Sequence, residues 1–339
     1  MTLSDSQYNL QVTASDLGPN PGTDTASVTI NFQPASSFPS ISVGTDTFNY
    51  PETQSVGTVL TSVQGSSSKP SPADTVTYHI AGGNEGDVFE VNPSGQVRLR
   101  RSLNYEETSS FNLWMEARDS DTPALSRYHR LRIALTDVND NPPIFSQNPY
   151  VGSVGENEGT LTSVLTVSAS DADSGLNGQF EYRLRATGNL DNSFQVNPNT
   201  GQVSTRRFLD REQRDSYTLV VEAVDKGSPT LTGTATVLIT VEDKNDNPMQ
   251  FRNLYSTAIL EDTPIGSFVI QVSTTDPDIG TNAMAQYKFS LDSQYAEARG
   301  KFNMGRDSGN VTVASTLDRE ISDHYELLVI AEDSAWEAN

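Results

Sequence analysis

The chain has 339 residues and carries 44 acidic against 22 basic side chains, a formal net charge of −22. Nucleic acids and anionic membranes select basic faces, so this charge argues against both as partners. No cysteine is present, which excludes disulfides, thiolate metal sites and cysteine nucleophiles. No run of 18 apolar residues occurs, and residues 1–20 lack the features of a signal peptide. We therefore expect a soluble protein or a piece of a longer one.

Short segments of alternating apolar residues recur along the chain. The first, 8–14, is followed by similar segments at 111–117, 217–223 and 325–331, and an aspartate comes two positions after each. Period-two alternation predicts strands with one buried face. Gly, Pro, Asn and Asp separate the segments, and helical periodicity is weak. The sequence thus predicts an all-β protein built from sandwiches of about seven strands each.

The spacing of these segments, close to 106 positions, predicts the domain layout. Residues 1–35 correspond to the C-terminal part of a truncated repeat. Residues 36–142 and 143–248 are expected to be complete repeats, and residues 249–339 a repeat that lacks its last strand. The incomplete first and last repeats predict a fragment of a longer chain.

An acidic string marks the end of each complete repeat. It reads Asp-Val-Asn-Asp-Asn-Pro-Pro from Asp137 and Asp-Lys-Asn-Asp-Asn-Pro from Asp243. Carboxylate, amide and carbonyl oxygens are the ligands that Ca²⁺ collects six to eight at a time. A single string of this kind also fits an ordinary turn. Two strings in register, with matched carboxylates elsewhere, favour a site for a hard cation.

Three further acidic signatures accompany the strings. A lone glutamate lies in an expected strand near the start of each repeat, an Asp-x-Asp follows, and Leu-Asp-Arg-Glu comes in mid-repeat. The glutamates are Glu52, Glu156 and Glu261, the Asp-x-Asp pairs are Asp171/Asp173 and Asp276/Asp278, and the mid-repeat pairs are Asp210/Glu212, Asp318/Glu320 and the variant Asn104/Glu106.

This ordered set resembles the cadherin repeat over essentially the whole chain, and most of all the middle of a long non-classical cadherin of the Fat, Dachsous or invertebrate N-cadherin kind. The resemblance implies tandem seven-stranded Greek-key (Ig-like) sandwiches in an elongated array, with about three Ca²⁺ at each intact junction. It further implies calcium-dependent cell–cell adhesion, on the extracellular side of the plasma membrane, by a segment of a single-pass membrane glycoprotein. Other cadherin ectodomains would be the partners, homophilic or heterophilic. The alternative is a purely structural, force-bearing spacer with no adhesive face of its own.

Carried over residue by residue, the resemblance predicts two calcium junctions. The Asn104 variant removes one carboxylate from the first, which should weaken its outermost ion. The first junction would use Glu52, Glu106, Asp137, Asn139, Asp140, Asn141, Asp171, Asp173 and Asp225, with the carbonyl of Asn177. The second would use Glu156, Asp210, Glu212, Asp243, Asn245, Asp246, Asn247, Asp276, Asp278 and Asp333, with the carbonyl of Asn282.

The earlier linker, at residues 31–40, departs from this pattern. It reads Asn-Phe-Gln-Pro-Ala-Ser-Ser-Phe-Pro where the acidic string belongs, and residues 64–68 read Gln-Gly-Ser-Ser-Ser where Asp-x-Asp belongs. Only Asp119 survives from the set. We expect this joint to bind no calcium, or one ion at most, and to bend or to pack its domains directly.

Two competing interpretations fit less well. An EF-hand loop would need Gly at its sixth position and Glu at its twelfth, where the string from Asp137 has Pro142 and Asn148. The Asp210/Glu212 pair could suit glycoside hydrolysis, but an enzyme seldom repeats its active site in every domain. With three histidines and no nucleophile motif, the chain is not expected to be an enzyme.

Overall fold

The computed structural model describes residues 7–17, 22–31, 37–67, 75–120 and 124–333. Contacts divide these into two units. The first holds the described residues up to 141 together with 172–179 and 226–229, and the second holds 142–171, 180–225 and 230–333. Residues 32–36 of the linker at 31–40, and Ser68 of the string at 64–68, lie outside the described residues.

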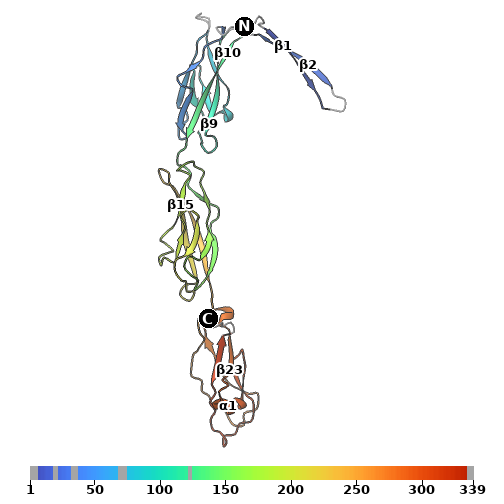
Figure 1. Ribbon diagram of the computed structural model, residues 1–339, viewed down its shortest axis with the longest axis vertical. Helices are drawn as coiled ribbons and strands as arrows, with labels where there is room; N and C mark the ends of the chain where they lie inside the picture. Colours follow the sequence, from blue (N-terminus) through green and yellow to red (C-terminus); the bar gives the residue numbers. More distant parts are fainter. Residues whose placement is uncertain (1–6, 18–21, 32–36, 68–74, 121–123, 334–339) are drawn as a thin grey trace. The chain divides into compact units, whose positions relative to one another are not determined.

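The first unit begins with an antiparallel hairpin of β1 (Gln7–Ser15) and β2 (Thr23–Asn31) (Figure 1). Leu10 stands opposite Val28 and Val12 opposite Ala26. Because side chains alternate along a strand, these four residues share one face of the hairpin. The period-two pattern read from residues 8–14 therefore marks a strand, as predicted, but the expected buried face is exposed, with Leu10 49% and Val12 53% exposed.

A β-sandwich follows in the first unit, made of two four-stranded sheets. One has the order β4-β10-β9-β6 and the other β3-β5-β8-β7. The strands are β3 (Ser42–Val43), β4 (Thr47–Pro51), β5 (Val59–Gln64), β6 (Thr77–Gly82), β7 (Phe89–Val91), β8 (Gln96–Leu99), β9 (Ser110–Arg118) and β10 (Ser126–Thr136).

Strict alternation along β9 supplies much of this sandwich's core. Phe111, Leu113, Met115 and Ala117 are all buried, whereas Trp114, on the opposite phase, is 48% exposed. The ring of Phe111 meets that of Phe89 edge-to-face, with centroids 4.9 Å apart. Burial of such apolar surface contributes about 25 cal/mol per Å² and drives the two sheets together.

The second unit contains an equivalent sandwich. Its main sheet has the order β12-β19-β18-β15, and β13-β17-β16 and β11-β14 complete it. The strands are β11 (Ile144–Phe145), β12 (Tyr150–Gly155), β13 (Ser163–Thr166), β14 (Ala169–Ser170), β15 (Phe180–Leu184), β16 (Phe194–Val196), β17 (Gln202–Thr205), β18 (Ser216–Asp225) and β19 (Thr232–Glu242). The all-β sandwich class predicted from the sequence is confirmed in both units.

The same unit ends in a set of shorter sheets, ordered β20-β22, β21-β25-β24 and β23-β26. A six-residue helix, α1 (Ala296–Lys301), precedes β24. The strands are β20 (Gln250–Phe251), β21 (Phe268–Gln271), β22 (Thr274–Thr275), β23 (Ala285–Phe289), β24 (Phe302–Met304), β25 (Asn310–Val313) and β26 (Val329–Asp333).

Parallel pairing of β4 and of β12 with the last strand of their sandwich, β10 and β19, positions the acidic residues. β4 runs parallel to β10 with Pro51 opposite Thr136, and β12 runs parallel to β19 with Gly155 opposite Glu242. Because the strands of each pair are parallel, they end at the same end of the sheet, and the residues that follow them lie side by side. The key glutamates thus lie one position beyond their strands, not within them as the sequence suggested.

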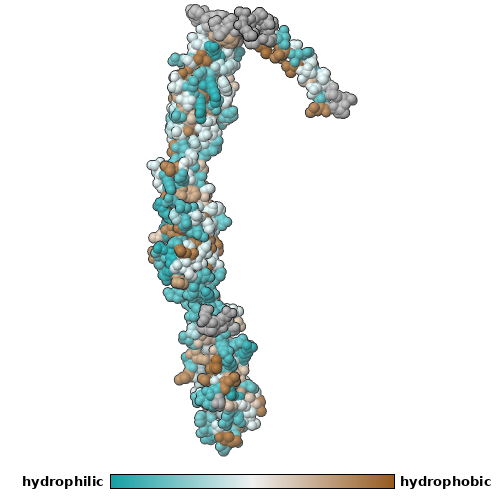
Figure 2. Space-filling view, viewed as in Figure 1, coloured by the Kyte–Doolittle hydropathy of each residue, from teal (hydrophilic) through white to brown (hydrophobic). Residues whose placement is uncertain are grey.

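The visible surface of the repeats is largely hydrophilic, with apolar residues scattered over it (Figure 2). This agrees with a mean hydropathy of −0.46 and the acidic composition. None of the helices in the described residues is long and apolar enough to cross a membrane.

Candidate metal centre

Glu52 connects two distant segments at the end of the first sandwich. Its side chain is only 5% exposed. Oε2 accepts the backbone N–H of Tyr105 at 2.6 Å, and Oε1 accepts that of Val138 at 2.8 Å. One carboxylate therefore holds the mid-repeat loop against the start of the acidic string.

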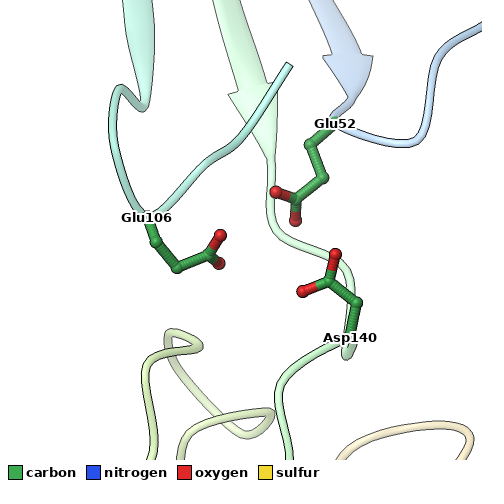
Figure 3. A group of neighbouring side chains, drawn as sticks. All are labelled: Glu52, Glu106 and Asp140. Carbon is green, nitrogen blue, oxygen red and sulfur yellow. The ribbon is translucent and has the colours of Figure 1, made fainter. Parts of the chain in front are cut away.

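Two groups of carboxylates converge around this glutamate. Those of Glu52, Glu106 and Asp140 point toward one another (Figure 3), with ligand oxygens within 4.8 Å of each other. Glu106, Asp137 and Asp173 form a second group of the same kind. Because Glu106 is common to both, the two groups are contiguous and could hold neighbouring cations.

Amide donors lock the linker onto the loop at 172–179. Asp137 accepts the side-chain amide of Asn177 at 2.8 Å, and Asp173 accepts that of Asn141 at 2.7 Å. The amide of Asn139, a 5% exposed residue, donates to the carbonyl of Pro229 at 2.6 Å. Asn177 was expected to offer its carbonyl. Its side chain instead orients Asp137, and the carbonyl role stays a prediction.

Two of these acids, Glu106 and Asp140, have raised pKa values. The pKa of Glu106 rises to about 7, first because the carboxylate is desolvated and then because Glu52, Asp140 and Asp173 repel its charge. Desolvation and repulsion by Glu52, Asp173 and Asp137 also raise the pKa of Asp140. A cation bound here would offset the repulsion between these carboxylates and the cost of desolvating them.

The second unit repeats the glutamate clamp and two of the linker hydrogen bonds. Glu156 is fully buried, and its two oxygens accept the backbone N–H groups of Arg211 and Lys244, both at 2.8 Å. The equivalent hydrogen bonds of the linker also recur. Asn282 donates to Asp243 at 2.8 Å, and Asn247 donates to Asp278 at 2.7 Å.

Two carboxylate groups again share a glutamate in this unit. Glu156, Asp210 and Glu212 form one, and Glu212, Asp243 and Asp278 form the other, each with ligand oxygens within 4.8 Å. Desolvation raises the pKa of Glu212, to which repulsion from Glu156 adds.

The remaining members of the set lie around these two groups. Desolvation and repulsion raise the pKa of Asp246, and the pKa of Asp276 rises for the same reasons, with Asp278, Asp333 and Asp243 as its charged neighbours. The structure therefore brings the predicted residues of this junction into one region.

The donor set fits a hard cation. Every side chain in it offers oxygen, which is what Ca²⁺ requires. Oε1 of Glu106, Oδ1 of Asn245 and Oδ2 of Asp276 are buried and have no hydrogen-bond partner among the described residues. Such oxygens are costly to bury without a partner, and a metal ion would satisfy them. In a bound state Ca²⁺ would supply positive charge that ties these oxygens together.

Three other predicted or variant positions, Asp171, Asp225 and Asn104, lie outside the four carboxylate groups described above. Asp171 and Asp225 belong to the second unit, where Asp225 accepts the backbone N–H of Leu231 at 3.0 Å. Asn104 is exposed, and its Oδ1 accepts the backbone N–H of Glu106 at 3.0 Å. A further acidic group, with oxygens within 4.8 Å of each other, forms at Glu261, Asp318 and Glu320, where all three residues are exposed.

Two residues at these sites were not singled out in the sequence. Arg211 donates its Nε proton to Asp243, so a guanidinium sits among the acids. Its position between two acidic residues of Leu-Asp-Arg-Glu was the available signal. Gly227 lies so close to Asn139 that an added Cβ would be 2.3 Å from its Cγ. A glycine before the Ser-Pro turn carried no comparable sequence signal.

The family model "Cadherin domain" matches residues 46–136, 150–242 and 255–339. The chain belongs to the cadherin family. It is 38% identical to Protocadherin Fat 4 of Mus musculus over 332 residues, which cover 98% of this chain and 6% of that protein. It is 37% identical to the Protocadherin-like wing polarity protein stan of Drosophila melanogaster over 289 residues, covering 83% of this chain and 8% of that one.

Solved structures agree with this assignment. Protocadherin Gamma B2 extracellular cadherin domains 3–6 match with a TM-score of 0.72 and 30% identity, covering 97% of this cadherin chain and 79% of that chain. These likenesses confirm the predicted resemblance to long, non-classical cadherins, whose matched relatives are far longer than the present chain. Cadherin repeats are ectodomain modules of membrane receptors rather than enzymes, and they generally bind Ca²⁺ at the linkers between domains.

Proposed function

We propose that this chain is a segment of a cadherin ectodomain that calcium makes rigid, and that it serves cell–cell adhesion outside the plasma membrane. The repetition of one carboxylate arrangement carries the proposal. Glu52 with Val138, and Glu156 with Lys244, make the same part-buried hydrogen bond at 2.8 Å at the two predicted junctions. Single acidic turns occur in many proteins, but a duplicated set of matched contacts needs a common purpose.

The chemistry of the groups gives the mechanism. Carboxylates this close repel one another strongly in a partly desolvated site. Ca²⁺ neutralises them, and a site that exists only when linker and loops are assembled stabilises that assembly. For one site the gain is RT ln(1 + [Ca²⁺]/Kd), about 2.7 kcal/mol at a hundredfold excess over Kd. About three ions per intact junction would turn a flexible linker into a stiff one.

The proposal includes the domain layout and the ligand sets predicted above. Repeats at 36–142 and 143–248 would each end in a calcium junction. The joint at 31–40 would bind no ion or one, because its string offers no carboxylate. Asp119, the survivor there, is 6% exposed and accepts the backbone N–H of Leu125 at 2.9 Å, a role that needs no metal.

Hydrogen exchange with and without calcium tests the proposal directly. Millimolar calcium should slow exchange in peptides covering 137–141 and 243–247 and leave those covering 37–40 unchanged. Small-angle scattering should show stiffening in calcium that chelation reverses. Equal exchange and equal scattering in both conditions would disprove calcium rigidification, while slowing at 37–40 would refute the calcium-free joint.

One observation favours an adhesive face over a pure spacer. Trp114 and Tyr128 are 48% and 54% exposed on the same sheet face, and Trp114 stands opposite Arg130. Trp, Tyr and Arg are the residues most enriched at binding hot spots. We propose that this face contacts another cadherin ectodomain.

Analytical ultracentrifugation in calcium separates the two functions. The chain should self-associate or capture a related ectodomain, and Trp114→Ala should abolish this at unchanged stability. Met115→Ala is the matched control in the neighbouring core position, where the residue is 0% exposed and the cost should be about 2–5 kcal/mol of unfolding free energy. A monomer that captures nothing under all conditions would support the spacer.

A further inference from the structure

The Arg211 side chain lies inside the second carboxylate set. Its Nε donates to Asp243, and its Nη2 donates to Glu212. The Arg211 side chain is only 11% exposed. Glu212 and Asp243 are two of the three carboxylates, with Asp278, whose oxygens lie within 4.8 Å of one another. A fixed positive charge therefore contacts two of the carboxylates that a cation would need.

This arginine also connects separate segments of the second unit. Nη2 donates to the carbonyl of Pro277 at 2.7 Å, and Pro277 lies between Asp276 and Asp278. The guanidinium fork thus joins the mid-repeat loop, the linker string and the Asp-x-Asp loop. Arginine suits this role because its planar donors engage several acceptors at once and its charge is permanent.

In the part of the chain that the structure describes, no arginine or lysine side chain forms a hydrogen bond or ion pair with Glu52, Glu106, Asp137 or Asp140, which makes a comparison within one chain possible. The position equivalent to Arg211 is Tyr105, since each donates its backbone N–H to the buried glutamate of its repeat. The Tyr105 side chain instead packs against the apolar core. Glu106, Asp137 and Asp173 otherwise form the same kind of group as Glu212, Asp243 and Asp278.

We propose that Arg211 acts as a built-in cation of the Glu212–Asp243–Asp278 group, competing with calcium for these oxygens and holding the linker partly ordered when calcium is scarce. The inference rests on the proposed calcium junction. Calcium must displace or share each oxygen that the guanidinium engages, so the ion binds more weakly than it would to the same acids alone. At low calcium, the arginine lessens the repulsion and keeps its bridge to Pro277.

The test compares the full chain with its Arg211→Gln variant, which keeps a polar side chain but removes the charge. Calcium titrations followed by hydrogen exchange report on peptides at 243–247 and 137–141 separately. The variant should shift the calcium midpoint at 243–247 to lower concentration by on the order of tenfold, the factor that 1.4 kcal/mol gives. In chelator, the same peptide should exchange faster than in the unsubstituted chain, while the peptide at 137–141 stays unchanged.

Two further variants keep the test decisive. Arg319→Gln changes the same motif position beside Asp318 and Glu320, all three of them exposed, and should leave both midpoints unchanged. Tyr105→Arg should raise the calcium midpoint at 137–141 and slow exchange there in chelator. If Arg211→Gln does not fold, the result for Tyr105→Arg tests the proposal instead. A midpoint that stays the same or rises in Arg211→Gln, or a linker no looser in chelator, overturns the role of Arg211. If neither linker of the unsubstituted chain responds to calcium, the calcium junction itself fails, and the two failures are thereby distinguished.

Discussion

The carboxylate of Glu156 accepts the backbone N–H of Lys244 at 2.8 Å, although 88 positions separate the two residues. The parallel pairing of β12 with β19 creates this contact, because both strands end at the same edge. The second oxygen of Glu156 accepts the N–H of Arg211. A predicted metal ligand is therefore also a structural clamp of its own repeat.

Glu156→Ala should destabilise the protein even in chelator. The change leaves two part-buried N–H groups without acceptors, each costing up to about 1–3 kcal/mol. We expect a loss of several kcal/mol in the free energy of unfolding, measured by urea denaturation in EDTA. Glu261→Ala is the matched control, since Glu261 accepts the N–H of Arg319 at 2.8 Å but is exposed. Equal losses for the two variants would mean that burial of the clamp is unimportant.

Asn104→Asp should strengthen calcium binding at the first junction. It adds a carboxylate where the second junction has Asp210, and ligand charge is one of the factors that tune calcium affinity. We expect roughly a tenfold lower midpoint, equivalent to about 1.4 kcal/mol, in calcium titrations followed by hydrogen exchange at 137–141. The reverse change, Asp210→Asn, should weaken the second junction. No shift in either variant would place this position outside the metal site.

Acidification should stabilise the first junction when calcium is absent. The pKa of Glu106 is about 7 in the folded chain and 4.5 is its ordinary value, so the folded state binds protons more readily. This contribution to stability is fully present below about pH 4.5 and is lost as pH rises through 7. Thermal unfolding in EDTA should therefore show a higher Tm at pH 5.5 than at pH 8.

With calcium present, the pH dependence should reverse at this junction. The ion needs the deprotonated Glu106, so its affinity should fall between pH 8 and pH 6. Glu106→Gln removes the titrating group, so in EDTA it should flatten the rise in Tm between pH 8 and pH 5.5. Retention of the full pH dependence in that variant would assign it to another acid.

Gly227→Ala should loosen the linker at Asn139. A methyl group there would lie 2.3 Å from Asn139 Cγ, which forces the amide away from its 2.6 Å contact with the Pro229 carbonyl. Hydrogen exchange at 139–141 should accelerate, and the calcium midpoint should rise severalfold. The control is Gly44→Ala, where no atom lies within 4 Å of an added Cβ. Unchanged exchange in Gly227→Ala would show that the Asn139 contact is dispensable.

The sequence alone determined the all-β class and the repeat, because alternation and turn residues are local properties that each strand carries by itself. It also determined the chemical type of the site, since two matched strings of oxygen-bearing side chains favour a site for a hard cation over other kinds of site. It placed the glutamates within strands, however, whereas Glu52 and Glu156 follow the strand ends. Local pattern cannot distinguish the last residue of a strand from the first residue beyond it.

Tertiary structure decided which atoms meet. Strand pairing brings Glu156 to Lys244, and only that geometry shows that its oxygens accept two backbone N–H groups. Arg211 and Gly227 are ordinary residues in the sequence. Their roles arise because a side chain's electrostatic and steric effects depend on neighbours that lie far away along the chain, and folding alone brings those neighbours within a few ångströms.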